Sequence, residues 1–169
     1  RTLVVVISQS GETLDTMAAL REAKSLGARI LSIVNVVGSS IARESDDVLY
    51  TWAGPEIAVA TTKAYSTQMA VLDLLAVYLA AQRNTISAEE ANRLTAAIAA
   101  LPAQVEQILS SREQIQYYAS QYFNHDSVFF IGRNLDYALG MEGSLKLKEI
   151  SYIHSEAYAS GELKHGTIS

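Results

Sequence analysis

The feature that most constrains the fold of this chain is an apolar run that ends in a hydroxyl-rich turn near the N-terminus. Residues 3–7 are Leu-Val-Val-Val-Ile, residues 8–13 are Ser-Gln-Ser-Gly-Glu-Thr, and a helical pattern begins near Leu14. Five apolar residues with three adjacent valines are typical of a strand that is buried on both faces of a parallel sheet. The sequence therefore predicts a strand, a turn and a helix in immediate succession.

The turn at residues 8–13, called the serine loop below, carries groups suited to an anion. Where a strand passes into a helix, the first backbone N–H groups of the helix are unpaired and the helix dipole places partial positive charge there. Ser8, Ser10 and Thr13 add hydroxyl donors, and Gly11 lets the backbone approach a ligand. The loop lacks a Walker A lysine and a Gly-x-Gly-x-x-Gly pattern, so a phosphomonoester fits better than a nucleotide. An N-cap without a ligand explains the motif alone equally well.

Composition excludes several classes of function. The 169 residues are 49% apolar and 18% charged, which is ordinary for one globular domain or two small halves. The net charge of −5 argues against nucleic acid as a partner, because no basic patch is available to neutralise phosphates. There is no cysteine, and the three histidines, His125, His154 and His165, have no metal-ligand spacing. We therefore expect no metal and no cofactor.

Neither a membrane segment nor a signal peptide is predicted. The longest apolar block, residues 70–81, is interrupted by Asp73 and is too short to cross a bilayer. We expect a cytoplasmic protein without a membrane partner. The chain opens at a strand and stops in a glycine-bearing turn at Gly166, so we also expect an interior segment of a longer polypeptide.

The rest of the chain alternates strands with helices, which predicts an α/β fold with a parallel sheet. Strands are expected at 28–34, 47–52 and 126–131, and helices at 12–26, 41–44, 61–82, 87–109, 111–123 and 134–153. Ser87, Ser111 and Asn134 are the expected caps, and Pro102 is an expected kink or break. The helix at 61–82 is apolar nearly all round, so we expect it to be central and buried. The recurrence of strand, glycine-bearing loop and helix suggests two related halves joined by helices near residues 83–124.

A second group of chemically active residues lies on the helix predicted at 134–153. Glu142, Lys146 and Glu149 are spaced i, i+4 and i+7, which places them on one helix face. A solvated face with a Glu–Lys pair is the commoner explanation of such a stripe. However, His165 follows between two glycine-bearing turns and can carry a proton at neutral pH, although a lone loop histidine usually has no such role. A carboxylate, an ammonium and an imidazole would supply a base, a charge stabiliser and a proton donor beside a carbonyl.

Several motifs together resemble one family. Residues 7–13 resemble the phosphate loop of sugar isomerase (SIS) domains, and residues 35–46 resemble their second-strand segment. The stretches 54–65, 145–152 and 156–166 are similar, more specifically, to the SIS region of the glucosamine-6-phosphate synthase family. The resemblance extends over nearly the whole chain and is weakest across residues 83–125.

The resemblance implies a parallel-sheet SIS fold, a Rossmann-like sandwich of flavodoxin type. It implies parts of two SIS subdomains, the first at residues 1–84 and the second, after a helical linker, within residues 85–169. The implied activity is the isomerase step of glutamine–fructose-6-phosphate aminotransferases: fructose 6-phosphate is aminated with ammonia from a glutaminase domain and isomerised to glucosamine 6-phosphate. The implied partners are the sugar phosphate, that glutaminase domain and a second subunit in a homodimer.

The resemblance also implies a role for each matching residue. Phosphate would be held by Ser8, Gln9, Ser10 and Thr13, and the sugar would be contacted by the backbone of Val59 and by Thr61. Glu149 would be the base that moves hydrogen between C1 and C2, and Lys146 would assist with charge and hydroxyl groups. His165 would help to open the sugar ring, reaching into the neighbouring subunit's site.

Other members of the family remain as alternatives. The glutaminase domain, an earlier Gly-Thr-Ser segment and a C-terminal tail with a further lysine are not in this sequence. A fructosamine-phosphate deglycase or an aminosugar-phosphate deaminase would share the serine loop and the carboxylate. A non-catalytic SIS module that senses a sugar phosphate would need only the serine loop. The joint presence of Glu149, Lys146 and His165 disfavours that last alternative.

Overall fold

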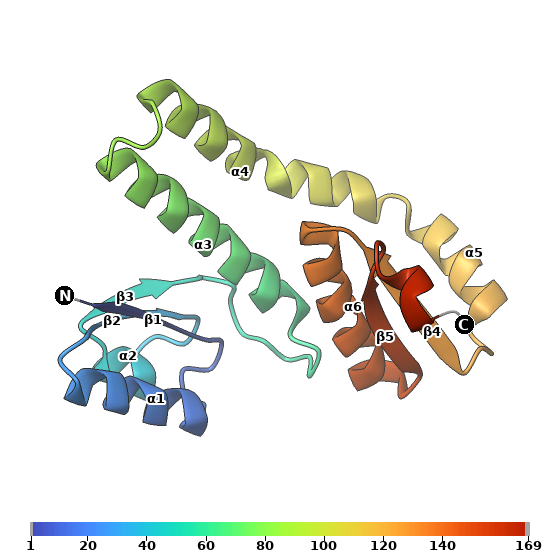
Figure 1. The fold of residues 1–169 in the computed structure, drawn as a ribbon, viewed down its shortest axis with the longest axis horizontal. Coiled ribbons are helices and arrows are strands. Elements are labelled where there is room, and N and C mark those ends of the chain that lie inside the picture. Colours follow the sequence, from blue (N-terminus) through green and yellow to red (C-terminus); the bar gives the residue numbers. More distant parts are fainter. Residues whose placement is uncertain (1, 168–169) are drawn as a thin grey trace. The chain divides into compact units, whose positions relative to one another are not determined.

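The computed structural model describes residues 2–167, and the chain divides into two compact units after Gln104. The first unit contains β1 (Leu3–Ser8), α1 (Leu14–Ser25), β2 (Arg29–Val34), α2 (Ser40–Glu44), β3 (Asp47–Tyr50), α3 (Thr62–Gln82) and most of α4 (Ala88–Leu109) (Figure 1). The second unit contains α5 (Arg112–Tyr122), β4 (Ser127–Gly132), α6 (Leu135–Ser151), β5 (His154–Ala159) and the short π-helix η1 (Leu163–Thr167). The predicted subdomain boundary after residue 84 stays a prediction.

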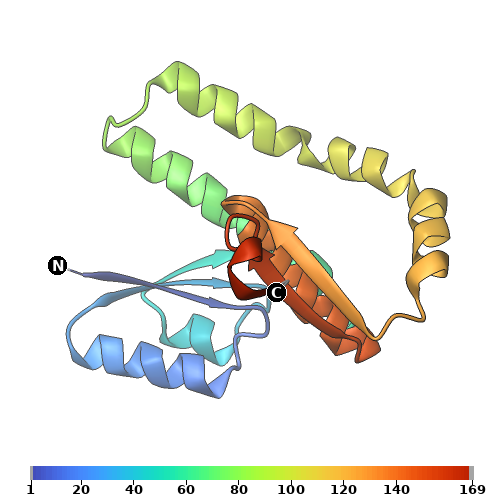
Figure 2. The same cartoon turned by 45° about the vertical axis from the view of Figure 1, so that its right-hand side comes forward.

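The first unit is built on the parallel sheet that the sequence predicted, and its strands lie in the order β1-β2-β3. Helices α1 and α2 cover one face of this sheet (Figure 2). The core between the helices and the sheet consists of buried side chains from β1, α1, β2 and α2: Val6, Met17, Leu20, Ile30, Val34, Ile41 and Ala42. Since parallel strands end at the same edge, the serine loop after β1 and the loops after β2 and β3 emerge together, where ligands bind in open α/β sheets.

Helix α3 is not the buried central helix that its composition predicted. Among its residues only Ala64 is buried, and Leu74 and Tyr78 are 42% and 59% exposed. On one side it lines an apolar groove of about 470 Å³ with Leu31, Leu49 and Tyr50, and on another side it meets α4 across a second groove of about 390 Å³. Apolar residues lie on every face of α3, but the described neighbours contact only part of its circumference.

The length and composition of α3 would also suit a membrane span, unlike those of the shorter apolar block considered above. Core helices satisfy the same two criteria, so this observation alone is weak evidence for a membrane segment.

The second unit is built around a βαβ unit in which β4 and β5 pair in parallel, from Ser127 with His154 to Gly132 with Ala159. Strand β5 was not predicted. Helix α6 packs closely on this pair because it carries glycines where it meets Phe130. A Cβ on Gly143 would lie 2.9 Å from the Phe130 ring. The hydroxyls of Ser144 on α6 and Ser155 on β5 are buried and lie 3.0 Å apart, and Ser155 also donates to the Ser144 carbonyl at 2.8 Å.

The helices predicted at 87–109, 111–123 and 134–153 begin and end within two residues of α4, α5 and α6, but only one of the three predicted side-chain caps forms. Ser87 accepts a hydrogen bond from the backbone N–H of Glu90 at 3.1 Å, which is the N-cap half of a capping box, while the Glu90 carboxylate contacts Arg93. Ser111 and Asn134 stand before α5 and α6 without forming a side-chain cap, and Asn134 has a φ of 52° and a ψ of −118°, unlike the extended backbone of a typical N-cap residue. Helix α4 continues through Pro102 without a break.

Candidate functional site

The serine loop turns back on itself at the end of β1. Ser8 is buried, its hydroxyl accepts a hydrogen bond from the Gly11 N–H at 3.0 Å, and it lies 3.0 Å from the Thr13 hydroxyl. The Ser10 hydroxyl accepts from the Glu12 N–H at 3.2 Å. Gly11 has a φ of +67°, a conformation that glycine adopts without strain. The structure therefore gathers the predicted hydroxyls of Ser8 and Thr13 into one tight turn.

The N-terminus of α1, which directly follows the serine loop, has no side-chain cap. Thr13 occupies the N-cap position in an extended conformation, yet its hydroxyl makes no hydrogen bond to the N–H groups of the first turn. At a helix N-terminus, a bound anion accepts hydrogen bonds from these N–H groups. This geometry disfavours the interpretation of the loop as a simple cap and favours an anion site.

Asn35, the first residue after β2, joins the ends of the three strands. Its N–H donates to the Gln9 carbonyl at 3.1 Å. Its side-chain oxygen accepts from the Thr51 hydroxyl at 3.0 Å and the Ala53 N–H at 2.9 Å, and its side-chain amide donates to the Gly54 carbonyl at 2.8 Å. Sequence analysis gave Asn35 no role. The feature of the sequence that indicates such a role is a polar residue directly after a strand of a parallel sheet.

The two predicted sugar contacts lie in the first unit, immediately before α3. Val59 is 89% exposed, and its carbonyl accepts from the Thr61 hydroxyl at 2.9 Å. Thr61 has a φ of 55° and precedes the first residue of α3. Within residues 2–167, neither residue makes a hydrogen bond to the serine loop, so the structure does not join these two parts of the predicted site.

The predicted stripe on α6 forms a three-residue charge cluster. The Lys146 ammonium lies 2.9 Å from a Glu149 carboxylate oxygen and 3.5 Å from a Glu142 carboxylate oxygen. The side chains of Lys146 and Glu149 are 21% and 32% exposed, so both are partly shielded from water. The hydrogen bond from Lys146 to Glu149 is the main cause that raises the pKa of Lys146, and the nearby charge of Glu142 adds to the shift. Lys146 is therefore an ammonium at neutral pH and can stabilise negative charge.

The charge cluster predicts a pH dependence for Lys146. We expect the Glu149→Gln variant to lower the pKa of Lys146 toward its ordinary value of 10.5, because a neutral amide replaces the closest carboxylate. Since the folded pKa is raised, the ion pair stabilises the fold below the ordinary lysine pKa, and this contribution is lost as the pH rises through the raised pKa. The measurement is an NMR titration of the lysine side-chain signals.

The matched control for this titration is Glu142→Gln, which removes the more distant carboxylate from the same helix face. It should lower the pKa of Lys146 by less than Glu149→Gln does. Equal effects would contradict the dominance of the Glu149 contact.

His165 lies apart from the charge cluster. It is exposed in η1, where its backbone N–H donates to the Glu162 carbonyl at 2.9 Å. In the described part of the chain, its imidazole makes no hydrogen bond or ion pair with Lys146 or Glu149. The predicted role of His165 in a neighbouring subunit's site remains a prediction.

The described residues contain no group of three or more histidine, aspartate or glutamate side chains placed to hold a metal ion. The serine loop offers hydroxyl groups suited to an anion, and the α6 cluster pairs an ammonium with two carboxylates.

Comparison with protein families assigns the fold. The SIS domain family matches residues 1–78 and 121–169, which is most of the chain. The chain belongs to the SIS domain family, and both the serine loop and the α6 cluster fall within the matched residues.

Individual relatives show which members of the SIS domain family this chain resembles in sequence and structure. The chain is 58% identical over 168 residues to a glutamine–fructose-6-phosphate aminotransferase (isomerizing) from Clostridium acetobutylicum, and 61% identical over 168 residues to one from Symbiobacterium thermophilum. Each alignment covers 99% of this chain but only 28% of the relative, so the chain spans less than a third of the length of these relatives. The C-terminal domain of glucosamine-fructose-6-phosphate aminotransferase from Francisella tularensis superposes with a TM-score of 0.95 at 42% identity, covering 98% of this chain and 47% of that chain.

Proposed function

We propose that this chain is the sugar-phosphate part of a glutamine–fructose-6-phosphate aminotransferase (isomerizing). The observation that carries the proposal is 58–61% identity to proteins of that name across nearly all of the chain. The geometry supports it, since a phosphomonoester suits the serine loop and a 1,2-shift of hydrogen suits the α6 cluster.

The proposed reaction has two stages. Ammonia replaces the carbonyl oxygen at C2 of fructose 6-phosphate with loss of water, which forms an imine. A proton then moves from C1 to C2 and the proton of the C1 hydroxyl is exchanged for one on nitrogen, which gives the C1 aldehyde and C2 amine of glucosamine 6-phosphate. Glu149 accepts the proton from C1 and returns it to C2, and Lys146 stabilises the negative charge that develops on the neighbouring oxygen. His165 assists opening of the sugar ring.

The proposed binding residues lie in the first unit. Ser8, Gln9, Ser10 and Thr13 hold the phosphate group, with the uncapped N-terminus of α1 adding backbone donors. Val59, through its backbone, and Thr61 contact the sugar.

The proposed partners follow from the same relationship. They are fructose 6-phosphate, a glutaminase domain that supplies ammonia, and a second subunit in a homodimer to which His165 extends. We place the protein in the cytoplasm and propose no nucleic acid, no membrane, no metal and no cofactor.

The proposal is tested in the intact natural protein by following the products of fructose 6-phosphate with glutamine, with ammonium and with neither nitrogen source. We expect glucosamine 6-phosphate with either nitrogen source and none without. Activity only in the reverse direction, releasing ammonia from an aminosugar phosphate, would instead identify a deaminase. Binding of the sugar phosphate without any turnover would identify a sensing module.

A further inference from the structure

The serine loop is supported from behind by the short helix α2. The Gly11 carbonyl accepts a hydrogen bond from the Ile41 N–H at 2.9 Å. Beside it, Ser39 is only 3% exposed and lies against the α-carbon of Gly11 so closely that a Cβ there would be 2.0 Å from the Ser39 hydroxyl. The shape of the loop therefore depends on the position of α2.

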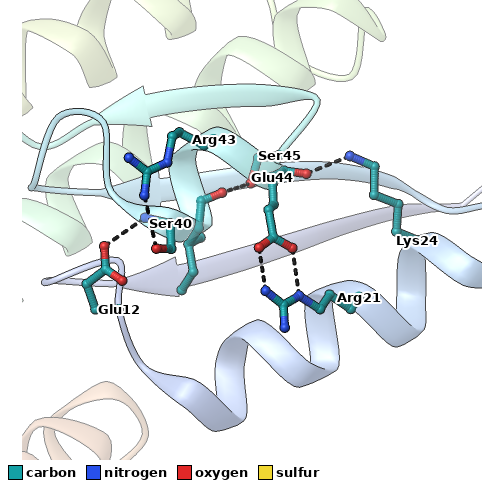
Figure 3. A network of polar contacts seen from close by, with 8 residues as sticks. Glu12, Arg21, Lys24, Ser40, Arg43, Glu44 and Ser45 are labelled. Carbon is teal, nitrogen blue, oxygen red and sulfur yellow. Dashed lines mark hydrogen bonds and ion pairs between the residues drawn. The ribbon is translucent and has the colours of Figure 1, made fainter.

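Glu12 makes the second connection between the loop and α2. Its carboxylate accepts a hydrogen bond from the Ser40 N–H at 2.8 Å (Figure 3). This bond is the main cause that lowers the pKa of Glu12, and the nearby Arg43 guanidinium contributes weakly in the same direction. Glu12 is thus a carboxylate beside an anion site whose charge is directed to the backbone of α2.

Helix α2 is in turn held by α1. The Arg21 guanidinium makes a two-pronged contact with the Glu44 carboxylate at 2.8 and 2.6 Å, and the Lys24 ammonium donates to the Glu44 carbonyl at 2.6 Å (Figure 3). Because the serine loop leads directly into α1, the loop, α1 and α2 form a closed set of contacts. A change at α2 is therefore transmitted to the loop.

The hydroxyl of Ser39 has no hydrogen-bond partner in the structure. Among the described side chains, the other buried polar atoms in this state are Ser32 Oγ, in the middle of β2, and Glu56 Oε2. The Ser39 hydroxyl lies directly beside Gly11 of the serine loop. An unpaired buried hydroxyl is costly and calls for an explanation.

We infer that Glu12 and Ser39 are positioning residues for phosphate binding, and that the Ser39 hydroxyl gains a hydrogen bond to the loop backbone when the loop holds a phosphate group. Glu12 fixes the loop to α2 in both states. Neither residue touches the substrate, so both act on affinity through the shape of the loop. The inference rests on the proposed function for the identity of the ligand.

The test compares four variants of the intact natural protein, using fructose 6-phosphate as the probe and inorganic phosphate and fructose as further ligands. Ser39→Ala should weaken binding of the sugar phosphate about fivefold, because a hydrogen bond of the bound state is lost. Its thermal unfolding temperature should be unchanged or higher, because no hydrogen bond of the free state is lost. Ser32→Ala is the matched control, since it removes an equally buried and unpaired hydroxyl away from the loop.

Glu12 is tested by the sign of its effect. Glu12→Ala should weaken binding about fivefold although it removes a negative charge near the phosphate, whereas Glu12→Gln should bind as the wild type because its amide oxygen still accepts the Ser40 N–H. Glu12→Ala and Ser39→Ala should raise KM for fructose 6-phosphate and leave kcat within about twofold, because their effect is on binding alone, whereas Glu12→Gln should leave both unchanged.

Two results would overturn the inference: Ser39→Ala binding as tightly as Ser32→Ala, or Glu12→Ala binding more tightly than the wild type. Failure of the proposed function looks different. Wild-type protein that binds inorganic phosphate but not fructose 6-phosphate would refute the substrate, while the variant comparison would still be decided with inorganic phosphate. Wild-type protein that binds neither would refute both.

Discussion

Replacement of Glu149 by glutamine is expected to abolish isomerisation while binding of fructose 6-phosphate survives. The glutamine side chain has the same shape and can still contact Lys146, which lies 2.9 Å from the carboxylate, but it cannot accept a proton at neutral pH. Loss of a general base typically lowers kcat by a factor of about 10² to 10⁴. The measurement is the exchange of hydrogen at C1 of the sugar phosphate with solvent deuterium, together with its dissociation constant.

The control for this experiment is again Glu142→Gln, which removes the same charge on the other side of Lys146. Its kcat should fall by less than about tenfold, because Glu142 only supports the ammonium. Hydrogen transfer that persists in the Glu149→Gln variant would exclude Glu149 as the base.

Replacement of Gly11 by alanine is expected to weaken the affinity for the phosphate group more than any other addition of one methyl group to the serine loop. The residue has a φ of +67°, and the new Cβ would lie 2.5 Å from the Ser39 Cβ. The left-handed conformation costs about 1–2 kcal/mol for alanine, and overpacking a buried contact adds about 1–3 kcal/mol. Rotation of the Ser39 hydroxyl cannot relieve the contact between the two Cβ atoms, so α2 must move.

The comparison variant is Gly38→Ala. Gly38 has a similar φ of +72°, but nothing lies within 4 Å of a Cβ built on it. It therefore reports the cost of the backbone conformation alone. Calorimetric titration with fructose 6-phosphate should show at least a tenfold weaker affinity for Gly11→Ala and nearly wild-type affinity for Gly38→Ala. Equal affinities would show that the contact with Ser39 does not control the loop.

The parts of the molecule that the sequence predicted well depend on local patterns. The apolar run of residues 3–7 correctly identified a parallel strand, but only one face of β1 is covered: Val6 is buried, whereas Leu3, Val5 and Ile7 are at least 40% exposed. The spacing of Glu142, Lys146 and Glu149 correctly placed three charges on one helix face. Both inferences use geometry that is fixed within one element.

The parts that were missed depend on contacts between elements. Strand β5 escaped prediction because its inward positions carry Ser155 and Ala157 rather than large apolar residues, and Ser155 gains its place only through Ser144 on α6. The exposure of α3 depends on which neighbours cover it, which composition does not state. The contact of the serine loop with Ser39 is likewise set by the packing of α2. Glu12 of the loop and Ser40 of α2 are 28 residues apart in the chain, with α1 and β2 between them.

The buried serine pair also fixes the alignment of β5. Ser144 can donate to Ser155 while Ser155 donates to the helix carbonyl, and this directional chain exists in one alignment of the strand. A shift of β5 by one residue would break both hydrogen bonds and turn the charged side chain of Glu156 toward Phe130. If alanines replaced Ser144 and Ser155, the same shift would not cost these two hydrogen bonds. A purely apolar contact would tolerate a shift of β5 along α6, whereas the directional hydrogen bonds of the serine pair do not. The starting point of the segment that leads to His165 is therefore defined to a single residue.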